Sequence, residues 1–597
     1  MNQIGLHWWD YGIIVLYFVG MIWVGWFFSK RNKNETDFLL GGRKMPIFPI
    51  AVSMLMSVFS TYSLVMTPGE IYNNGLDWGI TGHIMPFIGV LGVMLFTRFY
   101  FNIQAFTPFD YLAFRYDKYA RLLAALGSTY GQILYGGTVL LTTGKIFEAA
   151  AGWPSWMTIL VIGIISLIYT GSGGMKAVVW TDFIQFFVML FGMATLIITL
   201  CILVKGGAWG AITYAFENGH GLARFSEKEF YSLWPYVRLN FWALLLSRVW
   251  GALETGTSQM TVQRLMATGS IKNAVKAQFT SACLTLPVCV LLDFIGLAIF
   301  SYYSQNPDPA VTGGDLALFR FVATKLPPLV PGLFVAAALA AAMSTLSSIF
   351  NSQAAVWVKE YYMRFFRTDA TSEQQLSFAK TATWIIGLSS IGFSLLQELS
   401  YVYFKQTMVE VTMIFGIIAV GVGGNTYIFA ILSRKASSIF LWSYAAFFYG
   451  FKYPILIWYG ASKRCTNTFA ETGDIGYAGP ISFNWVWLPV VFIAIFWIIS
   501  FVKKENRRWK LTWRILSVIP LGFASASAIW YIFSHWANAI EPGVPHELSF
   551  TWSGLPGLVL GWVFMIVWHI FGPELPKEEY QGLCWGYSKL PILKKRS

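Results

Sequence analysis

The sequence predicts an all-α integral membrane protein with an inverted five-plus-five transmembrane helix repeat, one extra N-terminal helix and about four extra C-terminal helices. Hydrophobic spans recur from near Trp9 to near Phe571, each long enough to cross a hydrocarbon core of about 30 Å. We count about 15 such spans of about 20 residues or more. Lys and Arg lie on alternate loops, and two spans are interrupted by polar residues at corresponding places in the chain.

The composition agrees with a membrane protein. Of the 597 residues, 56% are hydrophobic and 12% are charged, whereas a soluble protein carries about twice this charged fraction. The net charge of +13 is spread over the loops, so the preference of Lys and Arg for the cytoplasmic side explains it better than a nucleic-acid partner. We therefore expect the lipid bilayer, and no nucleic acid, as a partner.

The loop charges also predict the orientation of the chain. Basic residues follow the first span at Lys30 and Arg43, recur on alternate loops, and include the run from Lys503 to Lys510 and Arg596 in the tail. The intervening loops are poorer in cations. This alternation places the N-terminus outside and the C-terminus in the cytoplasm, in a plasma or inner cell membrane.

The order of the spans divides the chain into four predicted segments. They are an N-terminal helix and cytoplasmic loop (1–45), a transporter core (46–435), additional C-terminal transmembrane helices (436–572) and a cytoplasmic tail (573–597). Within the core, we predict a first repeat over 46–205 and a second over 240–435.

Two spans are poorly suited to form continuous helices. The second span, 46–68, is interrupted by Ser57, Ser60 and Ser63, and the seventh span, 240–257, by Gly251 and Glu254 with their neighbours. Each opens a block of five spans, which is typical of an inverted-repeat transporter whose unwound backbone binds a cation and a substrate. The alternative is that the Ser and Thr hydroxyls bond back to carbonyls of an intact helix.

The ninth span supplies hydroxyl groups that match such a cation. Ser344, Ser347 and Ser348 lie three and four residues apart, on one face of a helix. A sodium ion binds about five oxygens, which these groups and carbonyls of a broken second span can provide. The alternative is a face of small residues that packs against another helix without an ion.

At these residues the chain resembles the sodium:solute symporter family, which includes the sodium–glucose cotransporters. The resemblance is carried by Phe38-Leu-Leu-Gly-Gly-Arg43, by Gly173-Gly-Met175 with Thr181-Asp182-Phe-Ile-Gln185, and by Ser344 to Asn351. Val262-Gln263-Arg264 is a smaller match. The resemblance covers about residues 10 to 460. It implies a sodium-coupled symporter with an inverted-repeat core, and no cofactor besides the transported sodium ion.

The resemblance also implies the ligands of the sodium ion. They are the carbonyls of Met56, Phe59 and Ser344 and the hydroxyls of Ser347 and Ser348. Relatives that bind a second sodium place an Asp, here Asp182, beside hydroxyls of the ninth span. Phe350 and Asn351 stand where some of those relatives have Ser. Asp182 is therefore either a second cation site or a hydrogen-bonded helix anchor.

The substrate site departs from the sugar-transporting relatives. Where these have a Gln, a Lys and an aromatic gate, this chain has Met413, Thr285 and Glu254. The other substrate-binding residues that we predict are Ser60, Ser63, His83, Trp250, Asp293 and Glu410. Hydroxyl-rich solutes need carboxylate and amide acceptors, whereas cationic amines need carboxylates and aromatic faces. We expect a sugar or polyol first, with a cationic amine or another non-sugar solute as the alternative.

Other classes of membrane protein fit less well. An ion channel needs a filter motif, and the sequence contains none that we recognise. The six His residues are dispersed, which disfavours a membrane-embedded enzyme. The Gly-x-x-x-x-Gly-Lys motif of a nucleotide-driven pump is missing from the sequence. We therefore predict a transporter and no enzymatic activity.

Overall fold

The structure is a computed structural model of the whole chain. It describes residues 7–30, 34–80, 82–233, 240–311, 313–404, 423–452, 484–502, 507–540, 555–589 and 591. The regular elements of these residues are all helices, which confirms the predicted all-α class.

The described residues contain seven helices that are long and apolar enough to cross a membrane, or eight if a bent pair counts as one span. That pair, Glu35–Arg43 and Ile47–Val58, is bent by 110°. The longest helix, α9 (Ser155–Leu203), has 49 residues, more than twice the length of one crossing. It breaks at Gly174, which has φ 59° and ψ −159°. This element thus covers two predicted spans, with the break at Gly174 between them.

The chain forms two compact units, and each is described by itself. The first contains residues 1–108, 129–226 and 251–412, and the second contains 109–128, 227–250 and 413–597. Our four-segment division by residue number follows the order of spans along the chain and stays a prediction.

The helices of the first unit surround a buried centre. They are α1 (Trp8–Ser29), α2 (Glu35–Leu40), η1 (Gly41–Arg43), α3 (Ile47–Val58), α4 (Thr61–Asn74), α5 (Asp77–Ile80), α6 (Met85–Asn102), α9, α10 (Gly207–Glu217), η2 (Ala223–Ser226), η4 (Glu254–Thr257), α12 (Gln259–Ala267), α13 (Ile271–Gln305), α14 (Gly314–Lys325), α15 (Val330–Val356), the π-helix η5 (Trp357–Phe366) and α16 (Ser372–Phe404).

The second unit contains the C-terminal helices. Its elements are α7 (Phe109–Arg115), η3 (Lys228–Tyr231), α18 (Gly424–Leu432), α20 (Asn484–Val502), α21 (Arg507–Leu516), α22 (Val518–Ile540), α23 (Leu555–Phe571) and η7 (Lys577–Glu579). Among the described helices, α8 (Lys118–Ala151) and α11 (Phe241–Leu253) contain residues of both units.

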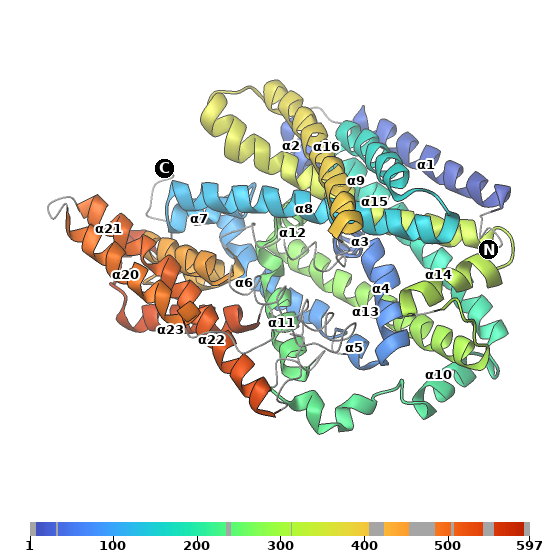
Figure 1. Cartoon of the computed structure of the whole chain (residues 1–597). Coiled ribbons are helices and arrows are strands. Elements are labelled where there is room, and N and C mark those ends of the chain that lie inside the picture. Colours follow the sequence, from blue (N-terminus) through green and yellow to red (C-terminus); the bar gives the residue numbers. More distant parts are fainter. Residues whose placement is uncertain are drawn as a thin grey trace. The chain divides into compact units, whose positions relative to one another are not determined.

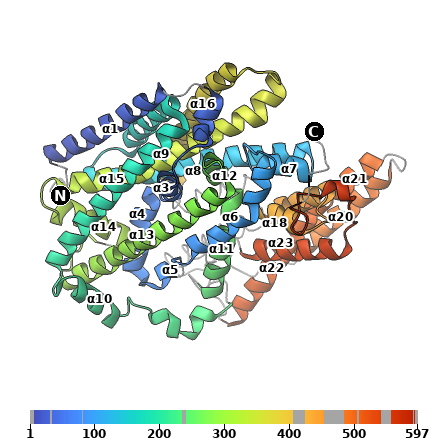
Figure 2. The same cartoon turned by 180° about the vertical axis from the view of Figure 1, so that it is seen from behind.

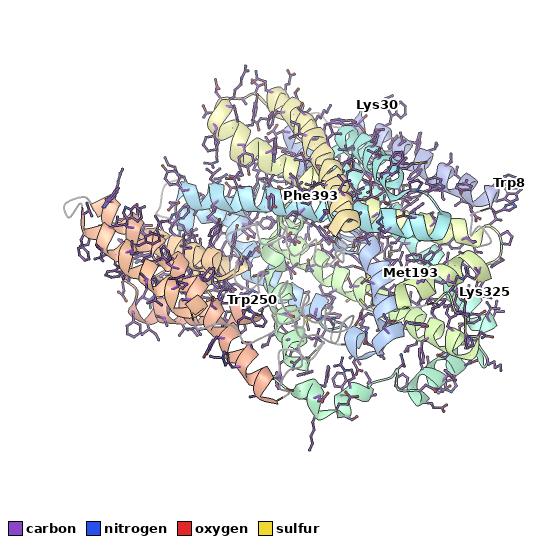
Figure 3. The ribbon with its side chains drawn as sticks, viewed as in Figure 1. Trp8, Lys30, Met193, Trp250, Lys325 and Phe393 are labelled. Atoms are coloured by element: carbon purple, nitrogen blue, oxygen red, sulfur yellow. The ribbon has the colours of Figure 1, made fainter. Side chains whose placement is uncertain are left out.

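Helix α15 is the centre of the first unit. It packs against α9 and α1 (Figure 1), and it is buried along almost its whole length. Small residues permit this close packing: a Cβ added at Gly192 of α9 would lie 2.6 Å from the Cβ of Ala337. The first helix runs alongside, with Trp8 at one end and Lys30 at the other (Figure 3). The predicted sodium ligands of α15 therefore lie in the interior of the unit.

The two predicted helix breaks are confirmed. Helix α3 ends at Val58, and Phe59 (ψ 101°) and Ser60 (ψ 174°) are extended before α4 begins. Helix α11 ends at Leu253 and is followed by the 3-10 turn η4 and by extended Ser258 (ψ 132°) before α12 begins. Helix α13 packs along α3, α4 and α6 (Figure 2).

The tail folds back onto its own unit. The Tyr111 hydroxyl of α7 donates to the carbonyl of Leu583 at 2.7 Å, and the amide of Trp585 donates to the carbonyl of Ile431 at 2.7 Å. The buried Arg115 guanidinium donates to the carbonyls of Ala430 and Ser433. The bonds to Ala430, Ile431 and Ser433 satisfy carbonyls at the C-terminal end of α18, which have no partner within the helix.

Candidate functional site

The break after α3 exposes backbone carbonyls toward α15. The carbonyl of Met56 accepts a hydrogen bond from the Ser344 hydroxyl at 3.0 Å, and the carbonyl of Phe59 accepts one from Thr345 at 3.4 Å. Carbonyls in the last turn of a helix lack partners inside the helix and carry the negative end of its dipole. A cation is therefore favoured at this point.

The facing part of α15 contributes the other predicted ligands. The hydroxyls of Ser347 and Ser348 donate to the carbonyl of Ser344 at 3.0 and 2.8 Å. All three serines are at most 1% exposed. The structure thus gathers neutral carbonyl and hydroxyl oxygens on two neighbouring segments, a donor set that suits a hard monovalent cation. The assignment of the five ligands stays a prediction.

Arg264 of α12 joins this set of oxygens to the second broken helix. Its NH2 group donates to the Ser348 hydroxyl at 2.5 Å, and its Nε donates to Ser53 at 2.8 Å. The guanidinium also contacts Asp182, with NH2 and Oδ2 3.3 Å apart, and all these side chains are buried. One cation therefore connects α3, α9, α12 and α15.

Asp182 is held from two sides. Its Oδ2 accepts from Ser53 at 2.5 Å and from Arg264. Its other oxygen, Oδ1, is buried without a hydrogen bond in the described part of the chain. The pairing with Arg264 compensates the charge that would otherwise be costly inside the membrane. Its role as a second cation site stays a prediction.

His83 and Asp293 form a pair. His83 Nε2 lies 2.8 Å from Asp293 Oδ2, and the two side chains are 17% and 9% exposed. Gly79 makes room for this contact, because a Cβ there would lie 2.4 Å from Asp293 Oδ1. Asp293 therefore has a histidine partner within the first unit.

The second break lies against α6. Glu254 and Thr255 are half-buried in η4. A Cβ added at Gly92 would lie 2.4 Å from the carbonyl oxygen of Leu253, so only glycine permits this approach. The Tyr100 hydroxyl, also from α6, donates to the carbonyl of Gly256 at 3.0 Å. The structure thus holds Glu254 in an irregular turn that packs against α6.

The remaining predicted substrate residues have different surroundings. Ser60 is buried in the first break, and Ser63 is half-buried in the first turn of α4. The Thr285 hydroxyl donates to the carbonyl of Ser281 in its own helix at 2.8 Å. In the second unit, Trp250 packs on Trp562, with ring centroids 5.2 Å apart. Glu410 and Met413 lie outside the described residues.

Sequence reasoning missed two polar residues of these breaks. Gln259 begins α12, is 4% exposed, and neither of its amide atoms has a hydrogen bond within the described residues. Thr345 bonds the carbonyl of Phe59, although our prediction used only the serines. The signal for Gln259 was its place directly after the interrupted stretch, where a polar side chain meets the positive end of a helix.

The chain is similar to known proteins in both sequence and fold. The sequence matches the profile of the sodium:solute symporter family over residues 38–435. It is 28% identical over 386 residues to the sodium/sialic acid symporter SiaT of Proteus mirabilis (strain HI4320), covering 64% of this chain and 76% of that protein. It is 30% identical over 367 residues to the sodium/iodide cotransporter of Homo sapiens, covering 59% and 55%.

Two further similarities extend this picture. The chain is 28% identical over 403 residues to the sodium-coupled monocarboxylate transporter 1 of Homo sapiens, covering 66% and 64%. More than a third of each human relative is therefore unmatched. The structure resembles the substrate-bound outward-open state of a Na+-coupled sialic acid symporter, with a TM-score of 0.63 and 23% identity over 87% of this chain and 98% of that one.

The similarity to the structure of the sialic acid symporter shows a shared fold. The profile match covers well over half of the sequence, and members of the matched family are sodium-coupled membrane transporters that use no other cofactor. The chain therefore belongs to the sodium:solute symporter family.

Proposed function

We propose that this protein is a sodium-coupled symporter that imports a small organic solute by alternating access. The observation that carries the proposal is the hydrogen bond between the Ser344 hydroxyl of α15 and the Met56 carbonyl at the break of α3. It brings the predicted carbonyl and hydroxyl ligands from two distant parts of the chain to one place. We expect a sodium ion to bind Met56, Phe59, Ser344, Ser347 and Ser348.

Sodium binding stabilises the arrangement in which α3 and α15 are close, because each segment supplies only part of the ligand set. The ordered break then presents the N-terminus of α4 to the substrate. Sodium and substrate therefore increase each other's affinity by the same factor. The membrane potential contributes about 2.3 kcal/mol per 100 mV for each transported charge.

The moving part is a bundle of α3 with α4, α6, α11 with α12, and α13. Its support is the packing of α13 along α3, α4 and α6 and the contact of η4 with α6 (Figure 2). Arg264 links this bundle to the rest through Asp182 and Ser348. Rocking of the bundle must therefore change the contacts at the Ser348 hydroxyl, a predicted sodium ligand.

The substrate that we propose first is a sugar or polyol. Glu254 offers a carboxylate acceptor, and the amide of Gln259, which has no hydrogen bond among the described residues, offers both a donor and an acceptor at the same break. Solutes rich in hydroxyls satisfy such groups. The names of the relatives include sialic acid, monocarboxylate and iodide transport, so a non-sugar solute of the same family is the second candidate.

Uptake into vesicles that contain the purified full-length protein tests both parts. We expect saturable uptake of one solute class from a panel of sugars, polyols, amines and carboxylates, and only with an inward sodium gradient. Equal uptake with a potassium gradient, or flux that does not saturate, would contradict a symporter and favour a channel.

A double variant tests the sodium ligands. Ser347→Ala with Ser348→Ala removes two of about five sodium oxygens, so half-maximal uptake should require at least about tenfold more sodium. Ser352→Ala is the matched control, because this buried serine lies one turn further along α15 and donates to the carbonyl of Ile349 at 3.0 Å. Unchanged sodium dependence in a well-expressed double variant would reject the assigned ligands but leave the family intact.

A further inference from the structure

The C-terminal helices line an apolar cavity of about 360 Å³ that is open on one side. Its walls include Leu488, Phe492 and Phe496 from α20 and Leu516, Ile519 and Phe523 from α21 and α22. Helices α20 and α22 pack side by side in the second unit (Figures 1 and 2). In a membrane, a cavity with only apolar walls accommodates a hydrocarbon chain.

Positive charge lies next to one end of the cavity. The Lys510 ammonium lies 5.5 Å from the ring centroid of Phe501, and the Arg514 guanidinium lies 4.8 Å from that of Trp497. Trp513, the residue before Arg514, packs on the wall residue Phe496, with ring centroids 5.5 Å apart. The charges and the cavity are therefore adjacent.

Within the described parts of its own three helices, this positive charge has no acidic partner. The described residues of α20, α21 and α22 contain no Asp or Glu. The Nε of Arg514 is buried and has no hydrogen bond among the described residues. From Lys503 to Arg514, the sequence contains a single acidic residue, Glu505. A buried guanidinium nitrogen without a partner is costly, and an anionic oxygen would satisfy it.

We propose that α20, α21 and α22 form a binding site for an anionic phospholipid. Its phosphate accepts hydrogen bonds from Arg514 and Lys510, and one acyl chain fills the cavity. The loop after α20 is cytoplasmic by the distribution of Lys and Arg, and the cytoplasmic leaflet is the one rich in anionic lipids. Rings of Trp497 and Phe501 hold the two cations at the depth of the headgroups.

Native mass spectrometry of the full-length protein in detergent tests the site, with phosphatidylglycerol and phosphatidylcholine as probes. We expect phosphatidylglycerol to be retained preferentially. Lys510→Gln with Arg514→Gln should weaken this retention by about 25-fold, at about fivefold for each charge. Ile519→Trp, which fills the cavity and keeps the charges, should weaken it too.

Lys30→Gln is the matched control. Lys30 also follows a transmembrane helix and lies 3.8 Å from the ring centroid of Trp26, but it is not a wall residue of the cavity. This variant should retain phosphatidylglycerol like the parent. Ile519→Phe is a smaller replacement that keeps the test valid if the Trp variant unfolds, as judged by size-exclusion chromatography.

Three results would overturn the proposal. The first is equal retention of the two lipids, or no loss in the charge variant. The second is full displacement by inorganic phosphate with no effect of Ile519→Trp, which means that only the headgroup is bound. The third is a lipid-free dimer that Ile519→Trp abolishes, which means that a second copy covers this face.

Discussion

Arg264 connects the predicted sodium site to other helices of the first unit through hydrogen bonds. It is 1% exposed and donates to Ser53, Ser348 and the carbonyl of Met260. A hydroxyl has one hydrogen and two lone pairs, so Ser348 can bond the Ser344 carbonyl, Arg264 and a sodium ion together. The two cations would repel each other unless Asp182 compensates the guanidinium.

Asp182→Asn should therefore weaken both the fold and sodium binding. Removing one partner of a buried ion pair costs about 3 to 5 kcal/mol, so the unfolding temperature should drop, and half-maximal uptake should need more sodium. Adding Arg264→Gln removes the uncompensated charge and should restore part of both. Thermal unfolding and sodium titration of uptake measure these effects.

The same titration distinguishes the two roles of Asp182. If it binds a second sodium, the Hill coefficient for sodium should decrease in both variants, and the added Arg264→Gln should not restore it. Recovery of the sodium affinity in the double variant, with an unchanged Hill coefficient, would identify Asp182 as the partner of Arg264 alone.

Glu254 separates the two substrate classes. Glu254→Gln keeps an acceptor for hydroxyl groups but loses the charge, and bonds to charged groups are stronger by about 1 kcal/mol. Uptake of a sugar or polyol should therefore need about fivefold more solute. Uptake of an amine should be lost, because an amide cannot balance a cation. The exposed Glu217→Gln in α10 is the control for a change in charge.

At the scale of the elements, close contacts at glycines hold the broken helices in place. Both breaks could be predicted from Ser, Thr and Gly residues that interrupt apolar spans. Their partners could not be predicted, since the contact of η4 with Gly92 of α6 depends on tertiary packing. For the same reason, we could predict the serines of α15 from the sequence. We could predict neither the hydrogen bond from Ser344 to Met56 nor the contacts of Arg264 with Asp182 and Ser348.

Gly92→Ala tests this packing. The added methyl carbon would lie 2.4 Å from the carbonyl oxygen of Leu253, and overpacking of this kind costs about 1 to 3 kcal/mol. We expect a lower unfolding temperature and weaker transport, because η4 carries Glu254 and must shift.

Gly131→Ala in α8 is the matched control. A Cβ at Gly131 meets no atom within 4 Å, so this variant should be neutral or more stable by up to about 1 kcal/mol. If Gly92→Ala behaves like this control in both assays, the close contact between α6 and η4 does not position the break.

At the scale of the whole molecule, hydrophobicity predicted the all-α membrane class, which the structure and the family match support. The orientation from loop charge and the number of spans stay predictions. Helix α9 covers two predicted spans and has a break at Gly174 between them, and several predicted spans near the C-terminus include residues outside the described ranges. Hydropathy reports which segments can be buried in lipid. It does not report where a helix turns back.

The orientation predicts that Asn2 faces outside and Ser597 faces the cytoplasm. Single cysteines at these positions, in a variant without the five native Cys, should react with a membrane-impermeant maleimide from opposite sides. Cysteines in place of Glu227 and Lys30 are the references for the two sides. Glu227 lies between the two predicted repeats, in the loop 206–238 that we predict to be external, and Lys30 follows the first span in a loop predicted to be cytoplasmic. Labelling of both termini from one side would mean that one span after residue 435 is miscounted. The core would be unaffected, because its orientation depends only on the loops before that residue.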